Sequence, residues 1–184
     1  WASTNGRGAG GGTAAGTAPS DRMHAVDRPE GYTSVSIGAS AEGAATFYGV
    51  VMETAGPGVV WDALGVVGVG TRSFVQQGRK HLAAQVAQRR PDLTVVMLGG
   101  NELGLPSLLA GKPEEYAGQY GDTLGRLRAG APAAGCLVIT PLDQGTRSGG
   151  AARSKPGLAA AIAAQREVAR TWGCAFWDAQ AAMG

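Results

Sequence analysis

The sequence predicts an α/β protein whose core is a doubly wound parallel sheet over residues 57–184. Four short apolar runs are typical of buried strands: residues 59–64, 93–98, 136–140 and 174–177. A helical stretch separates each consecutive pair of runs, at about residues 71–90, 114–129 and 156–172. Apolar strands that alternate with helices are typical of a parallel sheet covered on both faces, with its ligand site where the strands end.

The N-terminal part of the chain has a different composition and pattern of apolar residues. Residues 1–31 are rich in Gly, Ala, Thr and Ser, so we expect little regular structure there. Residues 32–37 alternate polar and apolar side chains, and residues 45–53 form a second apolar run after a Glu42-Gly43 turn. This pattern predicts a β-hairpin, with a short helix for the second run as the alternative.

Proline supports two of the three predicted helix starts. Pro113 and Pro156 stand near the beginning of the second and third helical stretches. The first turn of a helix tolerates proline, because the N–H that proline lacks has no partner there.

Composition excludes several classes of function. The 184 residues carry a net charge of only +2, which gives no concentrated basic surface for nucleic acid. No window reaches the ~18 uninterrupted apolar residues of a membrane span. Cys136 and Cys174 lack the spacing of metal ligands, so neither a metal nor another cofactor is expected.

Glycine and polar residues follow the predicted strands, at the edge where a ligand site is expected. These segments are residues 65–70, residues 99–102, residues 141–145 and Asp178. The most distinctive is Gly99-Gly100-Asn101-Glu102, which comes directly after an apolar run. A side-chain amide and a carboxylate thus stand side by side at a strand end.

That block, with the glycine-rich LGVVGVGT of residues 64–71 before it, resembles the SGNH (GDSL-type) serine hydrolases. The resemblance implies a flavodoxin-like fold and an esterase activity in which Gly68 and Asn101 form the oxyanion hole. The chemistry agrees, because ester hydrolysis passes through a tetrahedral oxyanion that preorganised N–H donors stabilise. The alternative is that Asn101 only shapes a turn and caps the next segment. For Glu102, a hydrogen-bonding or capping role is favoured over that of a catalytic base.

Two blocks that the resemblance calls for are not in the sequence. They are the Gly-Asp-Ser that carries the nucleophile and the Asp-x-x-His that carries the base. His24 and His81 are expected to be solvated or packed, and Ser40, in Gly38-Ala39-Ser40, is an alternative nucleophile. The nucleophilic serine and the histidine are therefore expected outside this chain, in missing parts of the same polypeptide.

The run FYGVVMETAGPGVVWDALGVVGVG at residues 47–70 resembles the peptidoglycan O-acetylesterase-like branch, in which a carbohydrate-binding-module-like β-sandwich is inserted. This implies closing strands of an antiparallel sandwich in residues 1–56 and an incomplete hydrolase domain in residues 57–184. The expected substrate is an acylated polysaccharide or a small ester. One alternative is a noncatalytic carbohydrate-binding or scaffold protein. Another is a nucleotide binder, prompted by Gly65-x-x-Gly68-x-Gly70, although no Lys-Ser/Thr follows it.

Three further expectations concern the strand ends and the cysteines. Asp143 is expected to line the pocket next to the oxyanion residues or to shape a turn, and Asp178 to cap or hydrogen-bond locally. In a flavodoxin-like order the strands that begin at Cys136 and Cys174 are parallel neighbours, so the two thiols either form a disulfide or stay buried and free. We expect the protein to be extracytoplasmic, where a disulfide would suit its compartment.

Overall fold

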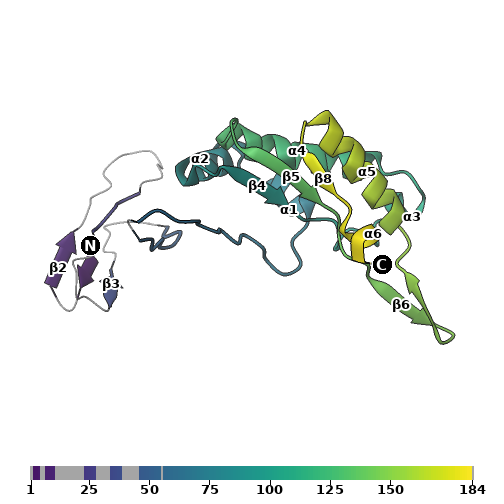
Figure 1. Cartoon of the computed structure of the whole chain (residues 1–184), viewed down its shortest axis with the longest axis horizontal. Coiled ribbons are helices and arrows are strands. Elements are labelled where there is room, and N and C mark those ends of the chain that lie inside the picture. The colour runs from purple at the N-terminus through teal and green to yellow at the C-terminus, as the bar shows by residue number, and fades with distance from the viewer. Residues whose placement is uncertain are drawn as a thin grey trace. The chain divides into compact units, whose positions relative to one another are not determined.

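The computed structural model describes residues 2–4, 7–10, 23–27, 34–38, 46–54 and 56–183. The chain divides into two compact units, Trp1–Val59 and Val60–Gly184. The residues expected to form the site, apart from Ser40, belong to the second unit. Figure 1 gives the labels of the helices and strands.

The first unit contains a three-stranded antiparallel sheet in the order β2-β1-β3. Its strands are β1 (Ala2–Thr4), β2 (Arg7–Gly10) and β3 (Val35–Ile37). The expectation of little regular structure before residue 31 was therefore wrong for β1 and β2. The predicted hairpin was also wrong, because β3 pairs with β1 and residues 46–54 form neither strand nor helix. An alternating pattern indicates a strand, but not which distant segment pairs with it.

The second unit contains a parallel sheet in the order β4-β5-β8, which confirms the predicted α/β fold. Its strands are β4 (Leu93–Val96), β5 (Gly135–Ile139) and β8 (Ala175–Trp177). Residues 59–64, predicted as a further strand, have no regular structure. Val60, Trp61 and Leu64 are exposed there. Within the described residues, this run has no neighbouring strand to supply ladder hydrogen bonds.

Six helices are described in the second unit (Figure 1). They are α1 (Thr71–Gln76), α2 (Arg79–Arg89), α3 (Pro106–Leu109), α4 (Glu114–Gly130), α5 (Leu158–Thr171) and α6 (Ala179–Met183). The helical stretch predicted for residues 71–90 is two helices, because the chain breaks at Gln77 and Gly78. The hairpin of β6 (Gly145–Ser148) and β7 (Ala151–Ser154) was not predicted.

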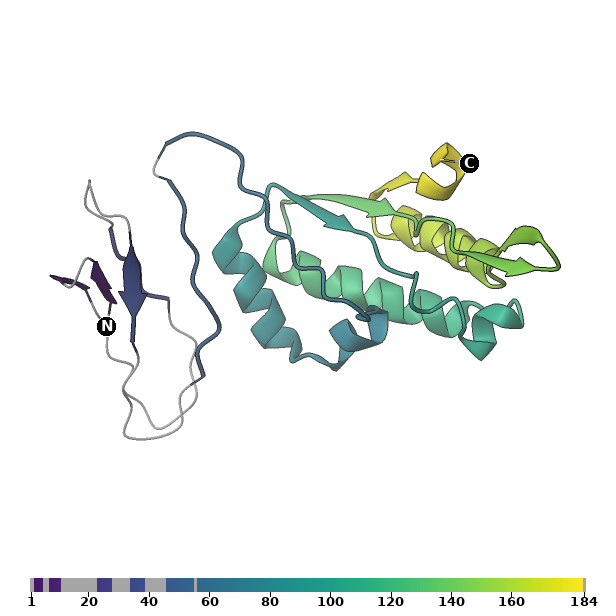
Figure 2. The ribbon, with the colours of Figure 1, turned by 90° about the horizontal axis from the view of Figure 1, so that it is seen from below.

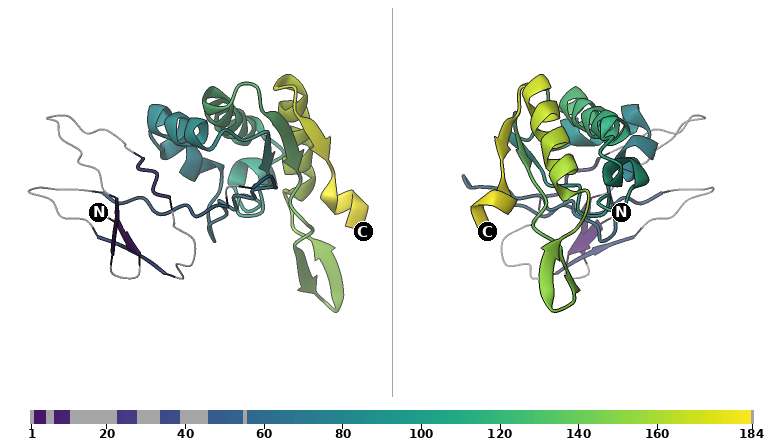
Figure 3. Two further views of the ribbon diagram at one scale, coloured as in Figure 1. Left: turned by 60° about the vertical axis from the view of Figure 1, so that its left-hand side comes forward. Right: turned by 90° about the vertical axis from the view of Figure 1, so that its right-hand side faces the viewer.

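Helices α4 and α5 lie on the same side of the sheet (Figures 2 and 3). The core lies between them and the strands, where Val96 and Val138 are paired across β4 and β5 and are buried. Side chains alternate between the two faces of a strand, so Leu93 and Trp177 point the other way. Both remain about half exposed.

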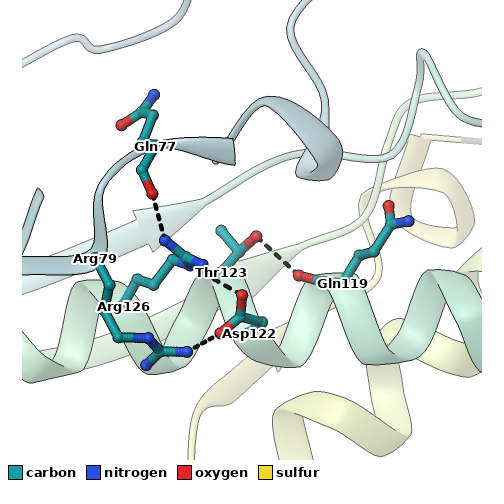
Figure 4. A network of polar contacts seen from close by, with 6 residues as sticks. All are labelled: Gln77, Arg79, Gln119, Asp122, Thr123 and Arg126. Atoms are coloured by element: carbon teal, nitrogen blue, oxygen red, sulfur yellow. Dashed lines mark hydrogen bonds and ion pairs between the residues drawn. The ribbon is translucent and has the colours of Figure 1, made fainter. Parts of the chain in front are cut away.

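A polar network holds the turn between α1 and α2 against α4 (Figure 4). The Arg126 guanidinium donates to the carbonyl of Gln77 at 2.6 Å and to the carboxylate of Asp122 at 2.9 Å. Arg79 also pairs with Asp122. Within α4, the Thr123 hydroxyl donates to the carbonyl of Gln119 at 2.9 Å. Helix α1 is thereby fixed to the longest helix of the unit.

Cys136 and Cys174 form a disulfide, with their Cα atoms 4.7 Å apart. Cys136 is near the start of β5 and Cys174 directly precedes β8, and these strands are parallel neighbours. Of the two alternatives for the cysteines, the disulfide is therefore confirmed. It lies at the opposite end of the strands from the predicted site.

Candidate active site

The glycine block before α1 forms a tight loop. The N–H of Val69 donates to the carbonyl of Val66 at 3.1 Å. Gly68 has a φ of +80°, which L-residues with a side chain rarely adopt. Helix α1 begins two residues after Val69, so the loop and the helix N-terminus are continuous.

Glu102 joins the start of α1 to the loop that follows β4. Its Oε1 accepts hydrogen bonds from the Thr71 N–H at 2.6 Å and from the Thr71 hydroxyl at 3.0 Å. Glu102 is only 7% exposed. A negative group at a helix N-terminus satisfies a free N–H and interacts favourably with the helix dipole. Glu102 therefore caps a helix that lies 31 positions away in sequence.

Gly70 makes this approach possible. A Cβ at position 70 would lie 2.7 Å from the carboxyl carbon of Glu102 and closer still to Oε1. Only a residue without a side chain lets the carboxylate reach the Thr71 N–H in this way.

Asn101 contacts the same glycine block. Its Nδ2 donates to the carbonyl oxygen of Val69 at 2.8 Å. An amide nitrogen carries two hydrogens, and Asn101 makes no other hydrogen bond within the described residues. The structure thus brings Asn101 next to the residue that follows Gly68, with one N–H still available at an exposed position.

An open cleft of about 430 Å³ lies beside Asn101. The cleft is lined by residues after the end of β4, by the glycine block and by the segment after β5. Its lining residues are Val69, Met97, Leu98, Gly99, Gly100, Asn101, Pro141, Leu142 and Gln144. Residues from two strand ends therefore surround one concave surface, as expected for a parallel α/β sheet.

The family of the chain follows from its sequence match. Residues 29–184 match the GDSL-like lipase/acylhydrolase family. The chain belongs to this family. The fold is therefore that of an SGNH hydrolase.

A solved structure agrees with the family. The chain is similar to a peptidoglycan O-acetylesterase at a TM-score of 0.54 and 26% sequence identity. The match covers 64% of this chain and 33% of that one, so this chain spans about a third of that structure. No curated protein gives a significant match.

Other residues were also considered for this GDSL-like hydrolase. Ser40 lies outside the described residues. His24 is exposed in the first unit, and His81 is half-buried on α2. Asp178 accepts from the N–H of Ala181 at 3.1 Å at the start of α6 and pairs with Arg166. Asp178 therefore has a local capping role.

The segment after β5 contributes a glutamine to the cleft where an aspartate was considered. Asp143 is exposed and accepts from the Ser154 hydroxyl at 2.7 Å, across the base of the β6–β7 hairpin. Gln144 lines the cleft and donates to the carbonyl of Gly100 at 3.2 Å. Lys155 in turn donates to Gln144 Oε1 at 2.7 Å. The hairpin is thus linked to the Asn101 loop.

Sequence reasoning also missed two buried residues behind the Asn101 loop. Gln165 on α5 donates through Nε2 to the carbonyl of Leu98 and to the Tyr116 hydroxyl, each at 2.7 Å. Burial raises the pKa of Tyr116 well above its usual value, and the neighbouring Tyr120 adds to this. Tyr116 therefore stays neutral. The signal that could have revealed Gln165 is its place on the apolar face of α5, between Ala161 and Val168.

Neither a cluster of metal-ligating side chains nor a helix of membrane-spanning length occurs among the described residues. No group of three His, Cys, Asp or Glu side chains among them is placed to hold a metal ion. No helix in the same part of the chain is long and apolar enough to cross a bilayer.

Proposed function

We propose that this chain supplies the oxyanion-binding part of the active site of a carbohydrate O-acetylesterase of the peptidoglycan type. The contact between Asn101 Nδ2 and the carbonyl of Val69 carries the proposal. It keeps the amide of Asn101 beside the Gly68 loop, at the edge of a cleft that a small acyl group could enter. The similarity to a peptidoglycan O-acetylesterase supports the choice of substrate class.

In this mechanism the chain's groups act on the acyl carbonyl. When a nucleophile adds to the ester carbon, the carbonyl oxygen becomes an oxyanion. The free N–H of Asn101 and the backbone N–H of Gly68 donate to that oxygen. Because the Asn101 amide is already held by the Val69 carbonyl before substrate binds, it costs little reorganisation as the charge develops.

The nucleophilic serine and the histidine base are proposed to come from parts of the same polypeptide outside these 184 residues. The Gly-Asp-Ser and Asp-x-x-His motifs that would carry them are absent from these residues. The sheet also supports a contribution from further parts of the polypeptide. Within the described residues, β4 pairs with β5 on one edge only. Val60, Trp61 and Leu64 are exposed, although apolar side chains of this size gain from burial. A further strand beside β4 would cover such residues.

An extracytoplasmic location is part of the proposal. The Cys136–Cys174 disulfide supports it, because disulfides persist mainly in oxidising compartments. An acylated cell-wall polymer would also be met there.

The test is the hydrolysis of p-nitrophenyl acetate and of O-acetylated peptidoglycan by the full-length protein. We expect acetate release from both, and a fall in kcat of about 100- to 1000-fold in Asn101→Ala. Asn101→Asp keeps the size but removes the N–H donors, so it is expected to fail equally. Turnover within twofold of wild type in both variants would remove Asn101 from the mechanism. Hydrolysis of the small ester alone would leave an esterase with another natural substrate.

A further inference from the structure

The side chain of Gln165 is completely buried, although it carries a polar amide. It lies on the inner face of α5, where its helical neighbours toward the core are Ala161, Val168 and Ala169. Burying an amide without hydrogen bonds costs about 1–3 kcal/mol. A purely structural position of this kind is normally filled by an apolar residue.

The Gln165 amide directs both of its Nε2 hydrogens at specific groups. One goes to the carbonyl of Leu98, the residue before Gly99, and the other to the Tyr116 hydroxyl, each over 2.7 Å. Tyr116 is itself fully buried on α4. The carbonyl at the end of β4 is thus held by a side chain from one helix, and that side chain is held by a second helix.

The backbone turns toward Asn101 at Gly99, which lies against the side chains of Gln165 and Tyr116. Gly99 has a φ of +115°, and a Cβ there would lie 2.5 Å from the Tyr116 hydroxyl and 2.6 Å from Gln165 Nε2. The Glu102 N–H then donates to the carbonyl of Gly99 at 3.2 Å, which closes the turn that presents Asn101. Position 99 therefore has no room for a side chain while Gln165 and Tyr116 stay in place.

We infer that Gln165 is a positioning residue for catalysis, which acts by fixing the Leu98–Gly99 backbone and thereby the carboxamide of Asn101. This inference rests on the proposed oxyanion role of Asn101. Donors stabilise a transition state only when they are placed correctly, and a displacement of about 1 Å can cost about 100-fold in rate. Removing the Gln165 amide lets the Leu98 carbonyl shift and lets the turn relax.

The first variant to measure is Gln165→Met in the full-length protein. Methionine fills a similar volume but cannot donate to the Leu98 carbonyl. We expect kcat for p-nitrophenyl acetate to fall at least about tenfold while KM stays within about twofold. Val168→Ala is the matched control, because it removes buried volume one turn along the same helix face. It should lower the melting temperature and leave kcat within about twofold.

A double-mutant cycle with Asn101→Ala separates positioning from general destabilisation. If Gln165 acts through Asn101, Gln165→Met has no further effect on kcat once Asn101 is alanine. An equal fold-loss in both backgrounds would overturn the inference while leaving the role of Asn101 intact. If Asn101→Ala alone keeps turnover within twofold, it is the proposed function that fails.

Tyr116→Phe is a second variant that tests the role of Gln165 if Gln165→Met does not fold. It removes only the hydroxyl that receives the second amide hydrogen and preserves the buried ring. We expect kcat to fall about threefold or more, and again no effect in the Asn101→Ala background. No loss in the wild-type background, or the same loss in both, would overturn the role assigned to the pair.

Discussion

The side-chain amide of Asn101 donates to the backbone carbonyl of Val69 across 2.8 Å, and the two residues are 32 positions apart in sequence. The next residue, Glu102, accepts from the N–H of Thr71 at 2.6 Å. Two consecutive side chains thus hold the end of the glycine block and the first residue of α1. The relative placement of the two loops is therefore set before any substrate arrives, as electrostatic preorganisation requires.

The hydrogen bonds from Thr71 to Glu102 depend on the absence of a side chain at position 70. In Gly70→Ala, the new Cβ would collide with the Glu102 carboxylate. We expect the free energy of unfolding to fall by about 1–3 kcal/mol and kcat to fall with it, because the start of α1 must move. Denaturant unfolding and ester hydrolysis measure the two effects.

Gly65→Ala is the matched control for this substitution. It lies in the same glycine block, but a Cβ there meets no atom within 4 Å. Its stability should stay within about 0.5 kcal/mol of wild type. A similar loss of stability in Gly65→Ala and Gly70→Ala would show that any side chain added to the glycine block is destabilising. The collision with the Glu102 carboxylate would then not be the cause.

Much of the second unit could be predicted because its strands are continuous apolar runs. β4 and β8 lie within the runs chosen for them, and β5 begins one residue before its run. The bounds of α4 and α5 are within about two residues of those expected. Residues 59–64 have the same apolar texture and form no strand. An apolar run indicates that a segment tends to be buried, whereas a strand also needs a partner for its backbone hydrogen bonds.

The site was only partly predictable for a related reason. Asn101 and Glu102 were recognisable because an amide and a carboxylate follow an apolar run. Gln165 and Gln144 look like ordinary helix and loop residues in the sequence. Their importance arises from contacts with Leu98 and Gly100, far from them along the chain. Such contacts leave no local pattern.

Gln144 offers a test of the cleft lining beside Gly100. Gln144→Ala removes the hydrogen bond to the Gly100 carbonyl, the hydrogen bond accepted from Lys155 and part of the cleft lining. The bond to Gly100, worth about 0.5–1.5 kcal/mol, holds the cleft lining, so its loss should raise KM by about two- to tenfold with little change in kcat. Arg147→Ala, exposed on the same hairpin, should leave both constants unchanged. A fall in kcat as large as the rise in KM would instead assign Gln144 to the transition state.

The disulfide is expected to contribute to stability but not to turnover. It closes a sequence separation of 38 residues and lies at the start of β5 and β8, away from the cleft. Replacing both Cys136 and Cys174 by alanine should lower the free energy of unfolding by about 2–4 kcal/mol. Ester hydrolysis at a temperature where the variant is folded should stay within about twofold. A larger loss would mean that strain at the start of the strands is transmitted to the site.

The paired tyrosines behind the Asn101 loop predict how the fold responds to alkali. Tyr116 and Tyr120 are buried with ring centroids 5.8 Å apart. Burial raises the pKa of both phenols above the usual 10.0, because a phenolate there would lose its hydration. The unfolded chain therefore loses these protons at a lower pH than the folded protein. Their contribution to stability is complete below about pH 10 and declines as the pH rises above it.

Alkaline titration followed by phenolate absorbance and circular dichroism checks this expectation. The signal of Tyr116 and Tyr120 should appear only as the secondary structure is lost. Above about pH 10, each phenol should steepen the decline in unfolding free energy by about 1.4 kcal/mol per pH unit. Tyr116→Phe should therefore reduce that slope by the contribution of one phenol. Ionisation of both rings while the dichroism remains native would contradict their burial, and with it the packing that holds Gln165 against Leu98.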